Sequence, residues 1–279
     1  MRDFNVPRSL DLERIAELHP QRFFLGVWRD LDAHAQEARN QRTGYDFRPL
    51  LVYGWAAICL TLIEYFGNIP AFEAFLYRAH LSIHPLSRSY ELVSYAWWTG
   101  WRLIGYFLLP ALFARVVLKE SVGTYGLCRN NARSLLWIYL LLYGVVLGLI
   151  AIVSRNEAFL VYYPFYSRAG ESGRDFLIWE AMYIAQFFAL EFFFRGFLLF
   201  PCRDAMGSSA VFAMVVPYTM IHFDKPLLEV FGAIVAGITL GTLALRTRSI
   251  LGGFLIHAAV ALSMDVMALL HRGELPMAW

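Results

Sequence analysis

Seven long apolar stretches constrain most strongly what this chain of 279 residues can fold into. A helix of about 20 mostly apolar residues crosses the hydrocarbon core of a bilayer. The candidate stretches cover residues 50–67, 92–118, 134–154, 176–200, 209–223, 227–246 and 249–270. The sequence therefore predicts an all-α fold, a polytopic transmembrane helical bundle with seven spans.

The composition excludes several other classes of protein. Hydrophobic residues make up 58% of the chain and charged residues 16%, and the mean hydropathy is +0.49. Soluble domains are roughly 45–50% apolar and about 25% charged, so a disordered chain and a typical soluble enzyme are both excluded. The net charge of +2 is too small to attract a polyanion strongly, and we expect no nucleic-acid partner. The three cysteines, Cys59, Cys128 and Cys202, are too widely spaced for a disulfide framework or a metal knuckle.

Two stretches fit the pattern of a span less well than the others. Residues 209–223 are few for a crossing and include Pro217. Residues 70–91 are too polar to cross comfortably and are predicted to form an amphipathic segment at the membrane interface, with an eighth span as the alternative. The polar residues of this second stretch include Glu73, Arg78, His80 and His84.

The first 49 residues differ in kind from the rest. They hold eight arginines and eight acidic residues, and apolar residues recur at helical spacing from Leu10 to Ala38. We predict an amphipathic N-terminal arm of one or two helices on the membrane surface, with a solvated, loosely packed arm as the alternative.

The remaining chain, residues 50–272, is expected to form one membrane-embedded domain, with no room for a second large one. The first apolar run begins near residue 50, so no signal peptide is expected. The arginines of the arm supply most of the bias that predicts a cytoplasmic N-terminus.

Several spans contain charged or imidazole side chains, although a charge at mid-bilayer costs about 2.5–3.5 kcal/mol on insertion scales. At about 100° per residue, Glu191 and Arg195 lie one turn apart and can pair, and Glu180 falls on the same line. His257 and Asp265 likewise share one face of the last span. Acyl chains offer no hydrogen-bond partner to these two rows of polar side chains. We therefore expect the two rows to face each other across a protein interior. The structural alternative is an ion pair that only fixes helix packing, with hydrogen-bonded core histidines.

One glutamate and two histidines on three separate spans form a minimal set for activating water. A carboxylate or an imidazole can accept a proton from water, and a second imidazole can stabilise an oxyanion. Glu191, His222 and His257 also match the ligand types of a His₂Glu zinc site, but the HExxH spacing is absent. No Gly-x-Ser-x-Gly motif is present.

Three short motifs give these residues a family context. The run EFFFRG from Glu191 to Gly196 is similar to the first motif of the CPBP (CAAX-processing and bacteriocin-processing) intramembrane proteases, also called the type II CAAX prenyl endopeptidase family. The run YTMIH from Tyr218 to His222 resembles the second motif, and His257 resembles the histidine of the third. The resemblance covers about residues 120–270, the family-like core.

The resemblance implies an all-helical membrane fold with a conical cavity, in which a glutamate and histidines activate water to hydrolyse a peptide bond. By position, it places Glu191 and His222 on the water-activating side and His257 toward the oxyanion, with Arg195 completing the first motif. The implied substrate is a membrane-associated peptide or protein. We expect no cofactor, with zinc as the alternative not favoured. The expected location is the inner (plasma) membrane of a bacterium.

The chain departs from the family pattern at two positions. Leu190 stands where a first glutamate is usual, and Ala261 stands where an asparagine follows the last histidine. Glu191 then has to act as the base, with Glu180 in support, while Asp265 either replaces the missing polar group or orients His257. A catalytically inactive pseudo-protease that serves as a membrane scaffold or peptide-binding protein is the main alternative. A proton-coupled carrier is a further alternative.

Overall fold

The computed structural model describes residues 20–84, 87–127 and 135–276, and helices dominate it. Within that part of the chain no strand is found, and helix accounts for 77% of the residues. The helices that precede residue 128 are α1 (Pro20–Asn40), α2 (Arg48–Phe66), α3 (Ile69–Arg78), α4 (Arg88–Leu103), the π-helical η2 (Ile104–Leu108), α5 (Leu109–Val116) and η3 (Val122–Tyr125). Those that follow residue 134 are α6 (Leu136–Val153), α7 (Glu157–Tyr162), α8 (Gly173–Glu191), the π-helical η5 (Phe192–Phe197), α9 (Arg203–Met206), α10 (Ser209–Met220), α11 (Leu227–Thr247) and α12 (Leu251–Arg272). The predicted all-α fold is confirmed.

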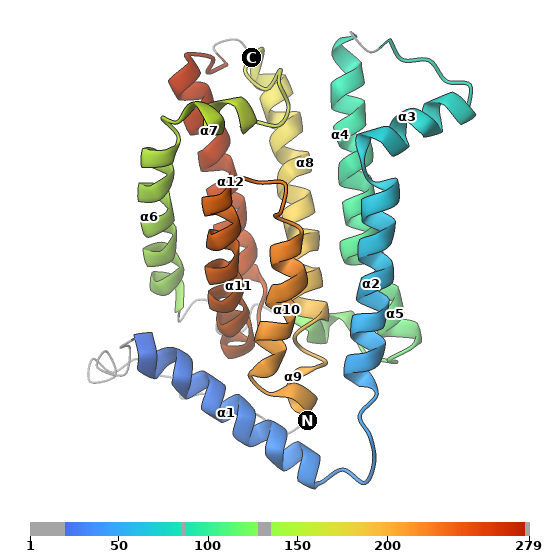
Figure 1. Cartoon of the computed structure of the whole chain (residues 1–279), viewed down its shortest axis with the longest axis vertical. Helices are drawn as coiled ribbons and strands as arrows, with labels where there is room; N and C mark the ends of the chain where they lie inside the picture. Colours follow the sequence, from blue (N-terminus) through green and yellow to red (C-terminus); the bar gives the residue numbers. More distant parts are fainter. Residues whose placement is uncertain (1–19, 85–86, 128–134, 277–279) are drawn as a thin grey trace.

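Five helical segments are long and apolar enough to cross a membrane. They are α2, α6, α8 with η5, α11 and α12. The count of seven or eight spans is not confirmed, because α10 has only 12 residues and the stretch predicted over 92–118 is broken. In that stretch the π-helical η2 separates α4 from α5, Pro110 stands in the first turn of α5, and α5 points away from the axis of α4 in Figure 1.

The polar stretch over 70–91 does not form an eighth span. Its first part is the ten-residue helix α3, which lies crosswise at one end of α2 in Figure 1. The Asn68 side chain accepts a hydrogen bond from the Ala71 N–H and so caps the start of this helix. A helix of ten residues rises only about 15 Å, which is too short to cross a bilayer.

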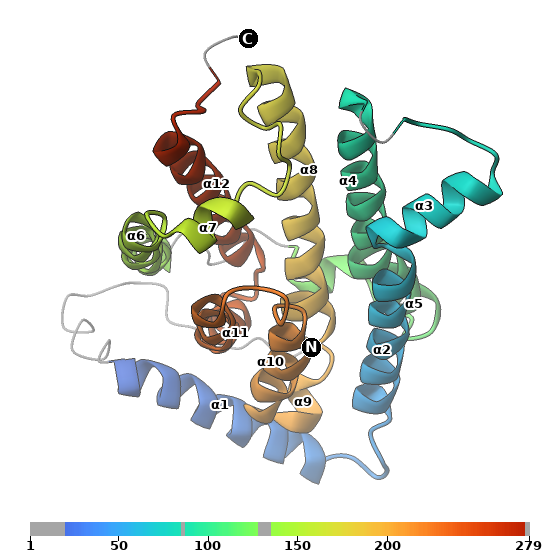
Figure 2. The ribbon, with the colours of Figure 1, turned by 45° about the horizontal axis from the view of Figure 1, so that its top comes forward.

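The N-terminal arm contributes one long helix, α1, which lies across one end of the bundle in both views (Figure 1, Figure 2). The Trp28 indole N–H donates to the Thr242 hydroxyl over 3.1 Å, and Asp32 accepts from the Ser208 N–H over 2.8 Å. The arm is thus packed on α9 and α11 rather than loosely attached. Residues 1–19, where the predicted helical pattern begins, lie outside the described residues.

The centre of the fold is α8, which lies between α4 and α12 in both views (Figure 2). It is the most buried of the five candidate spans and ends in a run of buried aromatic side chains. These are Phe192, Phe193, Phe194 and Phe197. By contrast, α6 has no charged residue and exposes apolar side chains along most of its length, as expected where a helix faces acyl chains. The residues of the first motif therefore occupy the protein interior and not its lipid-facing surface.

Candidate active site

The first motif forms a buried ion pair at the junction of α8 and η5. Glu191 is the last residue of α8, and its Oε1 atom lies 3.0 Å from Nη1 of Arg195. Neither side chain has any exposed surface. The predicted pairing of these two residues along one helix face is confirmed, and it takes place where the helix is wound as a π-helix.

Tyr218 connects this ion pair to the second motif. The Arg195 guanidinium lies 4.0 Å above the centre of the Tyr218 ring, and the His222 ring packs edge-on against the same ring at 4.8 Å. Gly237 of α11 makes room for this arrangement, because a Cβ atom there would lie 3.1 Å from Cδ1 of the tyrosine. A cation above an aromatic face is attracted by the ring quadrupole, so Tyr218 helps to hold the buried arginine.

His257 contacts the glutamate directly. Its Nδ1 atom lies 2.9 Å from Oε1 of Glu191, so one carboxylate oxygen contacts both Arg195 and the imidazole. The ring stacks on Phe187 with centroids 4.5 Å apart, which fixes its orientation. The His257 side chain is 16% exposed, whereas Glu191 is fully buried. Part of the imidazole therefore lies at the surface of the protein, whereas the carboxylate does not.

His222 follows α10, in the turn that leads to α11. Its Nδ1 atom donates to the carbonyl oxygen of Tyr218 over 2.7 Å, and the residue is buried. A carbonyl oxygen only accepts hydrogen bonds, so the neutral ring carries its proton on Nδ1 and its lone pair on Nε2. His222 and His257 both pack near Tyr218, whose ring centre is 6.5 Å from that of His257. The tyrosine thus gathers groups from η5, α12 and the turn after α10.

The remaining two predicted residues form a separate cluster. Glu180 and Asp265 are almost fully buried, and their carboxyl groups lie close enough to interact with each other. Asp265 also accepts a hydrogen bond of 2.7 Å from the Trp179 indole. Asp265 follows His257 by eight residues, about 12 Å along the helix. The structure therefore brings Glu180 and Asp265 together on the predicted rows, but away from Glu191, and Asp265 bonds to an indole instead of orienting His257.

The two positions that depart from the family pattern are occupied by buried apolar side chains. Leu190 packs in the large aromatic core, and Ala261 packs in the cluster that contains Trp179. Neither side chain offers a proton acceptor or donor, so neither can take over the polar role usual at its position.

No group of three or more histidine, cysteine, aspartate and glutamate side chains that could hold a metal ion is found among residues 20–84, 87–127 and 135–276. The expectation that the protein uses no cofactor stays a prediction. Cys59 and Cys202 are buried free thiols, and Cys128 lies outside the described residues. Burial raises the pKa of the Cys202 thiol to about 12, which disfavours the nucleophilic thiolate.

The sequence interpretation missed two contributors to the site, Phe187 and Gly253. A Cβ atom at Gly253 would lie 2.5 Å from Oε2 of Glu191, so only glycine lets α12 approach the carboxylate this closely. The available signal was the Gly252–Gly253 pair one turn before His257, since glycine inside a helix marks a close approach or a functional constraint.

Comparison with known proteins supports the motif assignment. Residues 173–263 match the family model described as type II CAAX prenyl endopeptidase Rce1-like. Neither the curated proteins nor the solved structures gave a match to the chain. The matched segment runs from the start of α8 to α12 and contains all three motifs. With five helices able to cross a membrane, the chain is an integral membrane protein, and the match confirms that its segment 173–263 resembles the type II CAAX prenyl endopeptidases.

Proposed function

We propose that this protein is an intramembrane endopeptidase that hydrolyses a peptide bond in a membrane-associated peptide or protein through an activated water molecule. The observation that carries the proposal is the 2.9 Å contact between Glu191 and His257, within a segment that matches a protease family. A carboxylate bonded to an imidazole is a frequent arrangement for general-base catalysis, because the acid fixes the tautomer and orientation of the ring.

In this proposal His257 is the base and Glu191 orients it. The Nδ1–H group donates to the carboxylate, so Nε2 carries the lone pair that accepts a proton from water. The different exposure of the two side chains supports this assignment, since only the imidazole has exposed surface. The resemblance by itself suggested the reverse roles, with Glu191 as base and His257 toward the oxyanion.

The reaction then balances with these groups. The water oxygen attacks the carbonyl carbon of the substrate while His257 accepts one proton, and the protonated imidazole later gives that proton to the leaving amine as the C–N bond breaks. Neutral His222 helps to orient the attacking water, because its Nδ1–H is donated to the Tyr218 carbonyl oxygen and Nε2 keeps a lone pair. Arg195 has no exposed surface, so its role is to neutralise Glu191 rather than to contact substrate.

The test is cleavage of a library of membrane-anchored peptides by the purified protein in lipid nanodiscs, followed by mass spectrometry. We expect His257→Ala to lower the cleavage rate by about 10²–10⁴-fold, the usual contribution of a general base. The matched control is His271→Ala, near the end of the same helix, where Nδ1 bonds to the Ser154 carbonyl away from the site. This control is expected to retain the wild-type rate.

Two outcomes would contradict the proposal. Cleavage that survives in the Glu191→Gln, His257→Ala double variant would show that these residues do not catalyse it. Peptide binding without cleavage by the wild-type protein would indicate a peptide-binding scaffold in place of an enzyme.

A further inference from the structure

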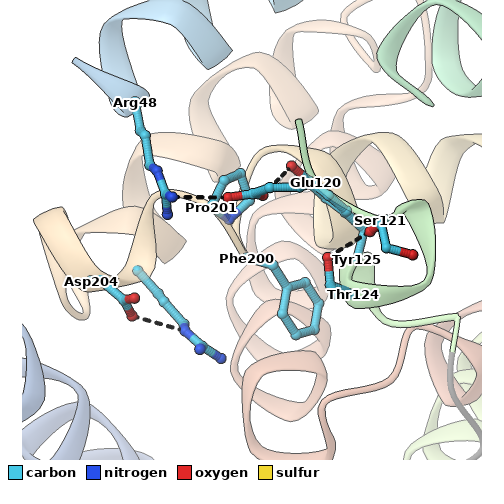
Figure 3. A pocket seen from close by; sticks show the side chains of 9 residues that line it. Arg48, Glu120, Ser121, Thr124, Tyr125, Phe200, Pro201 and Asp204 are labelled. Carbon is cyan, nitrogen blue, oxygen red and sulfur yellow. Dashed lines mark hydrogen bonds and ion pairs between the residues drawn. The ribbon is translucent and has the colours of Figure 1, made fainter. Parts of the chain in front are cut away.

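A pocket with charged side chains in its lining lies at the end of the bundle near the start of α2, outside the three motifs (Figure 3). It has a volume of about 260 Å³ and lies between α2, η3 and the chain that joins η5 to α9. Its polar lining includes Arg48, Glu120, Thr124, Arg203 and Asp204. None of these residues takes part in the proposed hydrolysis, so the pocket needs a separate explanation.

The charges around the pocket are balanced, because each arginine is paired with a carboxylate. Nη2 of Arg48 lies 3.0 Å from Oε1 of Glu120, and Nε of Arg203 lies 2.9 Å from Oδ1 of Asp204. The Tyr125 hydroxyl donates to the second oxygen of Glu120 over 2.7 Å. Each of the two ion pairs engages one nitrogen of a guanidinium group that carries five N–H donors, so donors remain for a ligand. Two cations and two carboxylates with no net charge match a zwitterion better than a simple anion.

The position of the pocket indicates that this zwitterion is part of a lipid. Arg48 is the first residue of the first candidate span, so the pocket lies at the depth where headgroups meet the hydrocarbon core. Leu51, one turn further into the membrane, is 41% exposed, and α5, which packs on α2, exposes Leu112 and Val116. These exposed apolar side chains lie on helices next to the pocket and suit acyl chains.

We propose that the pocket binds the headgroup of a zwitterionic aminophospholipid, phosphatidylethanolamine, with its acyl chains along α2 and α5. The phosphate contacts Arg48 and Arg203, since guanidinium groups bind phosphate oxygens well. The ammonium group contacts Glu120 and Asp204. This site does not depend on the proposed hydrolysis and would exist in an active enzyme or in a scaffold.

The same pocket is joined to the first motif through Tyr125. The Tyr125 ring packs on Phe197 and Phe192, with centroids 6.2 Å apart in each case. A Cβ atom at Gly196 would lie 2.8 Å from the Tyr125 carbonyl oxygen, so η5 and η3 are in close contact.

The experiment measures lipid binding by the full-length protein after delipidation in detergent, by native mass spectrometry and thermal unfolding. We expect phosphatidylethanolamine that is added back to the delipidated protein to bind to it and to raise its unfolding temperature. In the Arg48→Gln, Arg203→Gln variant the affinity is expected to fall at least tenfold. The matched control is Arg78→Gln, Arg115→Gln, which removes two exposed arginines outside the pocket and is expected to bind normally.

Three results would overturn the proposal. Equal affinity of wild-type protein for phosphatidylglycerol would show that the carboxylates do not recognise an ammonium group. Equal affinity for glycerophosphoethanolamine, which has no acyl chains, would indicate a small polar ligand instead of a lipid. Unchanged binding by the Arg48→Gln, Arg203→Gln variant would place the lipid elsewhere. A loss of preference for phosphatidylethanolamine over phosphatidylglycerol in Glu120→Gln, Asp204→Asn would support it.

Discussion

Two clusters of buried ionisable groups lie along α8 and α12, and they differ in what compensates their charge. In the first cluster, Glu191 contacts the cation Arg195 and the imidazole of His257. In the second, Glu180 and Asp265 lie beside each other, and Asp265 accepts a hydrogen bond from the Trp179 indole. No ion pair joins either of these two carboxyl groups to a basic side chain within the described part of the chain.

This difference separates a site whose charges are paired with each other from one whose two acids have no cation bonded to them. Burying a carboxylate is costly unless a cation or several hydrogen bonds compensate it. The first cluster keeps its charges and compensates them inside the protein. In the second, two buried carboxyl groups lie together without an ion pair, an arrangement that favours a proton on one of them and so removes part of the charge. Removing one partner should therefore lower the free energy of unfolding much more in the first cluster than in the second.

The largest expected effect is that of Arg195→Met, which leaves Glu191 buried beside His257 without its permanent cation. Breaking a buried ion pair by removing one partner costs about 3–5 kcal/mol, so we expect a loss of this size in the free energy of unfolding. Denaturant titration in detergent, followed by circular dichroism, measures it. The exposed Arg115→Met variant is the control and should change stability by less than about 0.5 kcal/mol. A loss below about 1 kcal/mol for Arg195→Met would show that the ion pair is not needed.

A smaller loss is expected from Gly253→Ala, which tests how closely α12 approaches the first cluster. The new methyl group would lie 2.5 Å from Oε2 of Glu191, and overpacking of this kind typically costs about 1–3 kcal/mol. The same unfolding assay measures it. Gly232→Ala on α11 is the matched control, because nothing lies within 4 Å of its Cβ position. Because alanine favours a helix more than glycine does, this control should raise the free energy of unfolding by up to about 1 kcal/mol. Similar behaviour of the two variants would argue against a close contact at Gly253.

A third variant, Tyr163→Phe, tests how the turn that carries His222 is held. The Tyr163 hydroxyl donates to Glu229 over 2.8 Å and accepts from Lys225 over 3.1 Å. Losing both bonds should cost about 1–2 kcal/mol. It should also speed hydrogen exchange in residues 221–226, as read by mass spectrometry. The control is Tyr65→Phe, at a side chain that is 71% exposed. Unchanged exchange in this segment would mean that the network does not restrain the turn.

The smallest effect is expected from Glu180→Gln in the second cluster. An amide N–H can donate to Asp265 much as a protonated carboxyl group does, so stability should change by less than about 1 kcal/mol. The comparison is Glu191→Gln, which leaves the buried Arg195 charge without its counter-ion and should destabilise by several times more. If Glu180→Gln lowers the free energy of unfolding as much as Glu191→Gln does, the two clusters do not differ in how their charge is compensated.

Much of the fold could be predicted from the sequence because lipid permits few solutions. The apolar stretches that became α2, α6, α11 and α12 were predicted to within a few residues, since their length and composition alone define a crossing helix. The interruption near Pro110 was not predicted, because a helix break in the membrane depends on whether neighbouring helices satisfy the freed backbone groups.

The candidate site was only partly predictable. The pairing of Glu191 with Arg195 is local, so helical periodicity gave it directly. The contact of Glu191 with His257 joins residues 66 positions apart, and its role depends on exposure, which no local pattern reports. The same holds for Tyr218, whose contacts come from three different elements.

By itself, the sequence determined that the chain is a helical membrane protein and which polar residues must lie inside it, because the cost of charges in lipid is a local property of composition and spacing. Only the tertiary structure decided which acid meets an imidazole and which meets another acid. That choice depends on how closely α8 and α12 approach, and it is fixed by small features such as the missing side chain of Gly253.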